Sequence, residues 1–292
     1  MKSIPFRRGA LLLTLAALCA TAPAAALEES RTWREVKTFA GGGPRVLVVD
    51  GVHGSITATD TRGDGVEMVI HEKVTGRTRE EIAAARRKVT LDSTQEGNQV
   101  KLYVNGPFRC GEHSICGDRD SEDLVERVTY DFELRVPAGT RIDLQTVHGE
   151  VRVSGTDGPF AVSSVMGRVE MSAVRGAGSA RSVNGPVKVA FADNPGGACH
   201  FETVNGTVDV AFRPGLAADL TLKTLNGEVY TDFPYVPRSL AAPAGDRRDG
   251  RFVLQRSEAS GIRIGAGGPE LVFATVNGDI FVRDQSSKET SR

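Results

Sequence analysis

The sequence predicts an all-β protein, specifically a β-solenoid (single-stranded β-helix-like) of 18–21-residue coils, with one short α-helix in its N-terminal part. Three observations predict it. A glycine-containing phrase recurs at near-constant spacing, apolar residues alternate with polar ones around each copy, and one row of polar positions alternates in charge sign. A fixed period of this size is typical of repeat architectures, in which each unit stacks on the one before it.

The phrase reads Thr/Ser-Val-Asn-Gly-x-Val in its clearest copies, and the glycines from Gly149 to Gly227 are spaced 18, 18, 21 and 21 residues apart. Asn tolerates the left-handed conformation of a tight corner, and Gly adopts it without steric cost. We therefore expect each copy to turn the chain from one strand into the next. The predicted corner residues are Gly54, Gly149, Gly167, Asn184, Gly185, Asn205, Gly206, Asn226, Gly227, Asn277 and Gly278.

Apolar residues alternate through each copy. Val147, Gly149, Val151 and Val153 share one parity, and the later copies repeat this pattern. Side chains on a strand alternate between its two faces, so we expect this parity to face the core. An antiparallel meander, in which each Asn-Gly forms a tight hairpin turn, fits the same phrase.

A row of charges favours the solenoid over the meander. Stacking the copies in parallel register aligns Arg152, Glu170, Lys188 and Asp209, whose signs alternate. Opposite charges at facing cross-strand positions stabilise a sheet modestly, and like charges do not. Parallel stacking predicts this alternation, whereas a set of hairpins does not require it.

The N-terminal residues 1–26 read as a secretory signal peptide. Lys2, Arg7 and Arg8 form a basic start, an apolar run follows, and small residues precede a cleavage point near Leu27. A lipoprotein anchored at Cys19 is the alternative, disfavoured by the large Leu18 before it. Residues 27–44, which end in a Gly-Gly-Gly-Pro run, are expected to form a flexible entry.

Residues 45–284 form the predicted solenoid domain. Thr78 and Glu81 make a capping box for a helix that continues to about residue 88, within a helix and cysteine-loop insertion at 76–130. A Pro- and Ala-rich loop insertion is expected at 234–250, and a disordered tail at 285–292.

Three cysteines follow the signal segment. In an oxidising compartment Cys110 and Cys116 are close enough in sequence to form a disulfide. Cys199 is then either a buried free thiol that packs as a small hydrophobe or the partner in an intermolecular bond.

The serial phrase, its early copy at 52–56, the helix near 79–88 and the Val136-Pro137-Ala138-Gly139 turn resemble the putative-adhesin family. The family consists of exported bacterial proteins whose shared domain has no assigned function. The resemblance covers roughly residues 45–284 and implies an exported, β-solenoid-like domain. His53 and His148 depart from the family pattern because Asn is usual at these positions, and the cysteine loop is an addition to it.

The residues suggest no chemistry. No nucleophile–base pair can be assembled, so we predict no catalytic residues and no enzyme. His53, His71, His113, His148 and His200 lack ligand spacing, so we predict no metal site and no cofactor. His148 and Glu150 come nearest to a pair, and a solvated corner is the favoured interpretation.

The chain carries 36 Lys and Arg against 37 Asp and Glu, a balance that argues against nucleic acid as a partner. No stretch after the signal segment is apolar enough to span a membrane. The favoured function is therefore a non-enzymatic protein exported to the bacterial periplasm or cell surface, a scaffold for adhesion or protein contact. Its partner is an envelope protein or a surface glycan. The alternatives are a glycan-binding or glycan-processing solenoid, with Tyr230 and Phe281 facing outward, and an envelope sensor or accessory protein.

Overall fold

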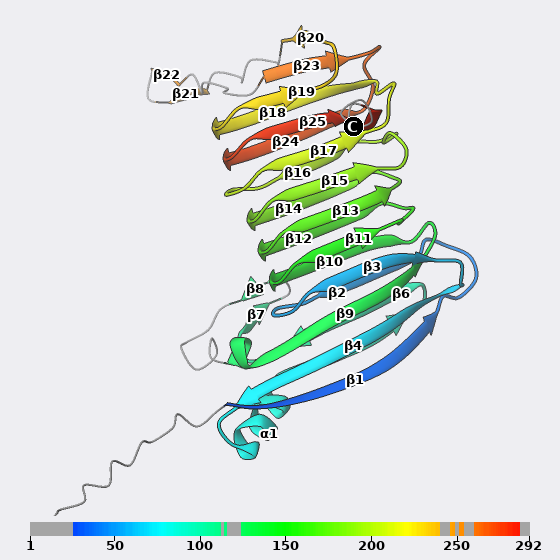
Figure 1. The fold of residues 1–292 in the computed structure, drawn as a ribbon, viewed down its shortest axis with the longest axis vertical. Helices are drawn as coiled ribbons and strands as arrows, with labels where there is room; N and C mark the ends of the chain where they lie inside the picture. The colour runs from blue at the N-terminus through cyan, green and yellow to red at the C-terminus, as the bar shows by residue number, and fades with distance from the viewer. Residues whose placement is uncertain are drawn as a thin grey trace, which may run out of the picture.

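The computed structural model describes residues 26–111, 114–115, 124–239, 246–248, 251–253 and 260–286. Two large mixed sheets contain most strands, which confirms the all-β prediction. Their strands stack along the long axis of the molecule (Figure 1). The predicted signal peptide, apart from Ala26, lies outside the described residues.

We call the 10-stranded sheet sheet A. Its strands in spatial order are β1 (Leu27–Thr38), β4 (Gly65–Gly76), β9 (Val128–Pro137), β3 (Ile56–Thr61), β11 (Val151–Ser154), β13 (Val169–Val174), β15 (Val187–Phe191), β17 (Val208–Phe212), β25 (Ile280–Asp284) and β19 (Val229–Thr231).

We call the 11-stranded sheet sheet B. Its strands in spatial order are β20 (Tyr235–Arg238), β23 (Ser260–Ile264), β18 (Ala218–Asn226), β24 (Glu270–Asn277), β16 (Cys199–Glu202), β14 (Gly178–Asn184), β12 (Phe160–Met166), β10 (Arg141–His148), β2 (Val46–Asp50), β6 (Gln99–Asn105) and β5 (Thr90–Glu96). Two small hairpins pair β7 (Arg109–Gly111) with β8 (Ser114–Ile115), and β21 (Asp246–Arg248) with β22 (Arg251–Val253).

Each copy of the phrase is a corner between the two sheets. A strand of sheet B ends at the corner and a strand of sheet A begins after it, for example β10 and β11 around Gly149. We call such a pair of strands with its corner a coil. Neighbouring coils pair in parallel in both sheets, so the alternative of Asn-Gly hairpins is wrong.

A hydrogen bond joins each corner to the corner below it. The Ser or Thr that begins the phrase donates its hydroxyl to the carbonyl of the preceding coil's glycine. The pairs are Thr146 to Gly54, Ser164 to Gly149, Ser182 to Gly167, Thr203 to Gly185, Thr275 to Gly206 and Thr224 to Gly278, at 2.8–3.1 Å. All of these hydroxyl-bearing residues except Thr224 are buried, so five of the six bonds are sheltered from water.

The corner glycines are required by space. A Cβ built on Gly185 would overlap the carbonyl oxygen of Gly167, and the same holds for Gly149, Gly167, Gly206 and Gly227 against the corner next to each. Gly54 and Gly278 also have positive φ angles of 131° and 147°. The glycine therefore permits the close stacking that the hydroxyl bond uses.

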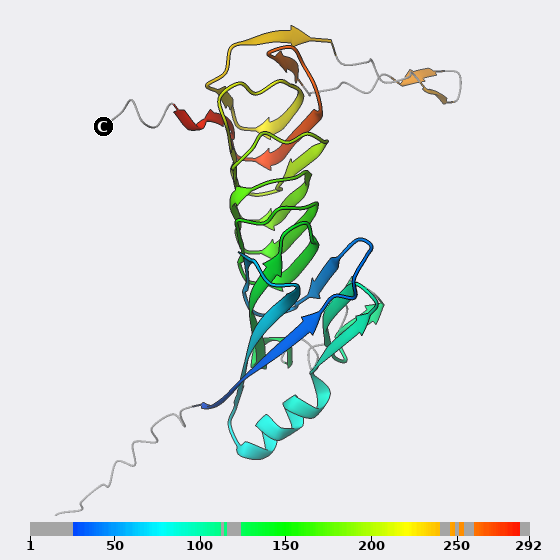
Figure 2. The ribbon, with the colours of Figure 1, turned by 90° about the vertical axis from the view of Figure 1, so that its right-hand side faces the viewer.

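The coils do not stack in sequence order. The last copy of the phrase, on β24 and β25, lies between the coil of β16 and β17 and the coil of β18 and β19. Asn277 therefore sits between Asn205 and Asn226 and not beyond them. The chain leaves through β18 and β19, passes through β20 and β23, and returns to fill this place (Figures 1 and 2).

The N-terminal end of the stack is closed by α1 (Arg79–Lys88), which lies below the sheets in Figure 2. Thr78 Oγ1 accepts a bond from the Glu81 N–H at 3.2 Å, and the Glu81 carboxylate accepts from Arg77 N–H at 2.9 Å. The predicted helix and its cap are confirmed. Ile82 and Ala85 are buried beneath the sheets, which gives the stack an apolar end cap.

Arg86 fixes this cap through charge. Its guanidinium donates to Glu72 at 2.9 Å and to Glu29 at 2.6 Å, which ties α1 to β4 and β1. The Tyr130 hydroxyl donates to the other Glu72 oxygen at 3.2 Å. Burial raises the pKa of Tyr130, and the Glu72 carboxylate raises it further.

Residues 27–38 are not a flexible entry, because they form the 12-residue strand β1 along β4. This strand lacks the apolar alternation that marks a strand in sequence, and backbone pairing along its whole length holds it. Trp33 packs edge-on against Tyr130, with ring centroids 6.5 Å apart.

The segment 76–130 is not an insertion outside the two sheets, because part of it is a strand of sheet B. β6 pairs in parallel with β2 and buries Val100 and Leu102, so it continues sheet B. Arg109, at the start of the predicted cysteine loop, bonds Asp50 at 2.8 Å, and the two side chains are 6% and 2% exposed. Removal of one partner of such a buried pair typically costs about 3–5 kcal/mol.

Two other predicted boundaries shift. The 234–250 segment begins with β20, an edge strand paired with β23, and residues 240–245 and 249–250 lie outside the described residues. In the predicted tail, the Gln285 side-chain amide donates to the Phe191 and Ala211 carbonyls at 2.6 and 3.2 Å. Residues 287–292 lie outside the described part.

Substitution of Gly185 tests the corner geometry. Gly185→Ala should destabilise the protein by about 1–3 kcal/mol, because the new methyl group meets the Gly167 carbonyl. Gly196→Ala is the matched control, since no atom lies within 4 Å of its added Cβ. Urea unfolding of both variants measures the difference, and equal stability would contradict the role given to the corner glycine.

Candidate contact surface

The corner asparagines bind one another. Asn205 donates its amide to Asn184 at 2.7 Å, Asn277 donates to Asn205 at 2.7 Å, and Asn226 donates to Asn277 at 2.8 Å. Each of these three bonds joins neighbouring coils. The predicted corner residues thus form a ladder whose amides are partly used by the fold itself, so they are poor candidates for ligand contacts.

Charged residues line the outward face of sheet A. Arg152, Glu170, Lys188 and Asp209 are successive Cα partners, as the parallel register requires. Lys188 lies 3.9 Å from Glu170. Arg152 contacts Glu150 on its own coil, and Asp209 accepts from Arg283 at 2.8 Å.

This charge row ends in two aromatic rings. Phe281 is the next Cα partner after Asp209, and Tyr230 follows Phe281. Their rings stack 4.9 Å apart with planes 8° apart, and Arg283 lies 4.5 Å over the Phe281 ring. The Tyr230 hydroxyl donates to Glu228 at 2.5 Å, which fixes the exposed ring in place.

The cysteines separate into two cases. Cys110 lies on β7, and Cys116 lies outside the described residues, so the disulfide stays a prediction. Cys199 is a free thiol on β16 with no exposed surface. Burial raises the pKa of the Cys199 thiol to about 11. An intermolecular bond at Cys199 would require the stack to open.

A row of aliphatic residues runs across the C-terminal ends of the sheet B strands. Each member lies one residue before the corner Asn, or before the His or Met that takes its place. We call this row the valine stripe, and it comprises Val147, Val165, Val183, Val204, Val276 and Leu225. All but Val147 are 37–57% exposed. These residues were predicted to face the core with the valines after the corner. That was wrong, because the strand alternation does not continue through a corner.

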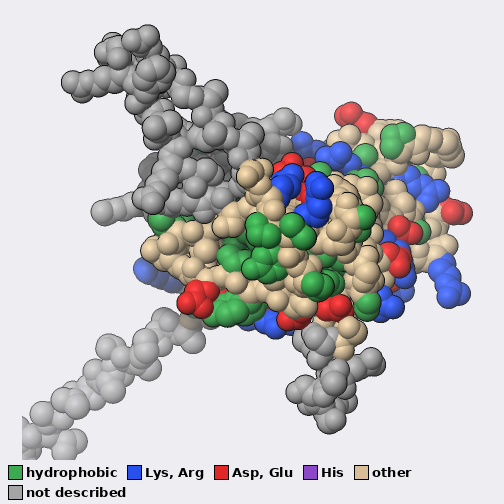
Figure 3. All heavy atoms as spheres, turned by 90° about the horizontal axis from the view of Figure 1, so that it is seen from above, with side chains coloured by type: hydrophobic (Ala, Val, Ile, Leu, Met, Phe, Trp, Pro, Cys, Tyr) green, Lys and Arg blue, Asp and Glu red, His purple; other side chains and the backbone are tan. Residues whose placement is uncertain are grey.

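The stripe ends at the coil of β18 and β19, which is the last coil in space, and the core is uncovered there. The residue that follows the corner by two positions is fully buried in the other coils, as with Val208 and Ile280 at 0% exposed. Its counterpart Val229 is 39% exposed. Figure 3 looks onto this end and shows hydrophobic side chains gathered there beside charged ones.

We call the exposed apolar residues of this end the end patch, and they are Leu225, Val229, Tyr230, Tyr235 and Val236. Nearby on sheet B, Arg263 on β23 donates two bonds to Asp219 on β18, at 2.7 and 3.0 Å. The Arg263 guanidinium holds the pKa of the Asp219 carboxyl below its usual range. An apolar patch rimmed by charge is typical of a protein contact site.

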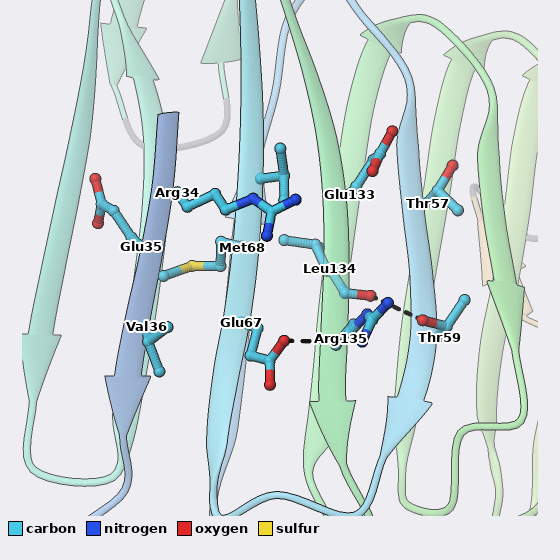
Figure 4. Close-up of a pocket in the computed structure, with 11 residues that line it drawn as sticks. Arg34, Glu35, Val36, Thr57, Thr59, Glu67, Met68, Glu133, Leu134 and Arg135 are labelled. Atoms are coloured by element: carbon cyan, nitrogen blue, oxygen red, sulfur yellow. Dashed lines mark hydrogen bonds and ion pairs between the residues drawn. The ribbon is translucent and has the colours of Figure 1, made fainter. Parts of the chain in front are cut away.

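A separate hollow of about 420 Å³ lies over β1, β4, β9 and β3 (Figure 4). Arg34, Glu67, Glu133 and Arg135 line it, with Arg135 4.0 Å from Glu67. The Thr59 hydroxyl is directed to the Leu134 carbonyl at 3.3 Å. Glu35 also lines it, so three carboxylates face two guanidiniums. The hollow is open and carries both signs of charge, so it suits weak polar contacts better than an enclosed substrate.

In the described part of the chain, no three His, Cys, Asp or Glu residues gather into a metal site, and no helix is long and apolar enough to cross a membrane. His148 and Glu150 share one corner, but Glu150 contacts Arg152 and lies 3.5 Å from Arg168. Its carboxylate therefore belongs to an ion-pair group on the surface.

No protein-family model matches the chain, and no curated protein matches it by sequence. A putative cell adhesion protein from Clostridium sporogenes ATCC 15579 aligns over 88% of this chain and 100% of its own, at 11% identity and a TM-score of 0.43. A putative adhesin from Bacteroides fragilis NCTC 9343 aligns over 88% and 97%, at 11% identity and a TM-score of 0.37. These TM-scores are below 0.5, so neither fold nor function is transferred from the two proteins.

The register of sheet B can be tested with one isolated ion pair. Arg181 and Glu202 are Cα partners, and Arg181 Nε lies 3.5 Å from Glu202 Oε2. Their outer neighbours in the row are the uncharged Ser163 and Ala274. Arg181→Glu should cost about 0.2–1 kcal/mol, and adding Glu202→Arg should restore it. A urea double-mutant cycle with no coupling between the two changes would contradict the contact. Glu170 is less suitable, because charges flank it on both sides.

Proposed function

We propose that this chain is a non-enzymatic protein exported to the bacterial periplasm or cell surface. Its repeat coils, which pair in parallel within the two mixed sheets, form a β-solenoid that serves as a scaffold for adhesion or protein contact. The N-terminal sequence pattern supports export, and the uncovered last coil supports the contact role. The latter observation carries the proposal.

Exposed valine alone is ordinary in a strand, because β-branched residues favour extended backbone. The valine stripe differs from scattered apolar exposure in its continuity. Its members come from successive strands about 4.8 Å apart, so they form one row across the ends of the strands. The row shares Leu225 with the end patch, where the interior between the sheets is exposed at Val229.

The neighbouring face of sheet B is suited to close approach. Its outward positions include the small residues Ala161, Ser163, Ser179 and Ala274, and the Arg181–Glu202 pair. The small side chains at these four positions leave space beside larger residues such as Arg181 and His200, so a partner that covers the stripe can also pack there. Repeat proteins commonly bind partners along such extended surfaces.

Photo-cross-linking in cells that export the chain tests the contact role. A benzophenone amino acid at Val204 or Val229 should give discrete protein adducts. One at the exposed Ser154, on β11 of sheet A and away from the end patch, should give none. Val229→Lys should reduce the adduct from position 204 while stability changes by no more than about 0.5 kcal/mol, because position 229 is already partly in water. Val208→Lys, at the buried counterpart, should prevent folding.

Two results would contradict this function. Equal adduct yields from all three positions, or none from either apolar position, would remove the case for a contact surface. Polysaccharide turnover that is lost on substitution of His148 or Glu150 would contradict the non-enzymatic proposal.

The Tyr230–Phe281 stack favours a second candidate, a glycan-binding surface. The exposed Tyr230 ring, stacked on the half-buried Phe281 and beside a carboxylate and a guanidinium, offers both an apolar face and polar groups for a sugar. On a glycan array, Tyr230→Ala should remove any signal, and Tyr235→Ala, which truncates another exposed tyrosine, should not. Signal loss in both variants, or in neither, would argue against this site.

A further inference from the structure

The residue before each corner glycine forms a row whose chemistry changes along the stack. In spatial order the row reads His53, His148, Met166, Asn184, Asn205, Asn277 and Asn226. The four Asn coils are joined amide to amide. The three coils at the other end carry side chains that cannot extend this amide chain, and all three are metal-ligating types.

The two histidines are at a distance that suits a shared ion. Their ring centroids are 6.0 Å apart with planes 63° apart. Two imidazoles that bind one metal at about 2.0–2.1 Å per nitrogen have centroids about 5–6 Å apart. Small side-chain rotations therefore suffice to place both rings on one ion.

His53 is held in a ligand-competent form. Its Nδ1 lies 3.0 Å from the Val125 carbonyl oxygen. A carbonyl only accepts, so Nδ1 carries the proton and the lone pair of the neutral ring is at Nε2. A backbone carbonyl that orients a metal-binding histidine in this way is a common outer partner in metal sites.

Met166 supplies the third group. It is the parallel Cα partner of His148, on the side away from His53, and its side chain is 52% exposed. Met166 lies one strand spacing, about 4.8 Å, from His148 and two spacings from His53, so its flexible thioether approaches the ion from the His148 side. Glu150, the carboxylate of this corner, already contacts Arg152 and lies 3.5 Å from Arg168.

Two imidazoles and a thioether, without a free carboxylate, select soft ions. We propose that His53, His148 and Met166 form a binding site for a soft monovalent cation, of the copper(I) class. The sequence alone separates these residues by up to 113 positions, and the parallel stacking of three coils brings them together. The site lies at the opposite end of the row from the end patch, and the valine stripe passes beside it at Val147 and Val165.

Silver(I) is a suitable probe, because it shares the ligand preference of copper(I) and needs no reductant. Calorimetric titration of the mature chain should show one silver(I) bound with submicromolar affinity. His148→Asn should weaken binding by more than about 100-fold, since loss of even an outer partner costs 10–100-fold. Met166→Asn should weaken silver(I) binding about 10-fold and leave zinc(II) binding unchanged, because zinc(II) does not require the thioether.

The controls use residues that the fold already accepts. Asn occupies this position in the other coils, so both variants should keep their thermal unfolding midpoint. His200→Asn removes an exposed histidine on sheet B and should leave affinity unchanged. Titration of a Cys110→Ser/Cys116→Ser/Cys199→Ala variant, which also removes the free thiol of Cys199, excludes binding by thiolates. The proposal is overturned by affinity weaker than about 10 μM, well short of a dedicated site. It is also overturned by binding that survives His148→Asn or that disappears in the cysteine variant.

Discussion

The hydroxyl-to-glycine bond between neighbouring corners is the interaction on which the rest of the structure depends. A hydroxyl such as that of Thr203 reaches the Gly185 carbonyl only because Gly206, three residues later, brings no Cβ against that carbonyl. The bond fixes which coil position faces which. Once that register is set, the valines after each corner stack in the core, and the charges of sheet A align with opposite signs. Each bond contributes only about 0.5–1.5 kcal/mol, so its repetition matters more than any one copy.

A corner that fits every other corner does not encode sequence order. The last copy of the phrase lies beside the coil of Gly206, and the preceding copy stacks on top of it through the Thr224–Gly278 bond. Both junctions use the same contacts as the junctions between sequential coils. The order must therefore be set by the connections, here by β20 and β23, and not by the phrase. Because the coil of β24 and β25 lies between the coil of β17 and the coil of β19, the coil of Val229 is at the end of the stack. Its apolar side is uncovered there.

The sequence predicts most where a pattern has one physical cause. The period and alternating charges of the repeats predict parallel neighbours, and Thr78 with Glu81 predicts the helix and its start. Prediction from the sequence fails where a residue pattern fits two structures or where a segment shows no pattern. Val183 and Val187 look equivalent in parity, yet a corner lies between them and only Val187 is buried. β1 has polar residues on both faces, so nothing but its backbone pairing with β4 reveals it. The valine stripe was missed for the first reason.

The same constraints indicate where this fold can carry function. Within the phrase, the hydroxyl residue, the glycine and the following valine are committed to packing, because a change at any of them breaks a buried contact in two coils. The two positions between the hydroxyl and the glycine point to solvent in each repeat coil that follows Gly149, as at Val204 and Asn205. They can vary without cost to the register. Both surfaces argued here, the apolar row and the histidine–methionine group, occupy these two positions. A stack of this kind therefore has two adjacent rows of side chains at fixed spacing whose identity the fold does not constrain. The residue type that each coil carries at these positions determines what the surface can bind.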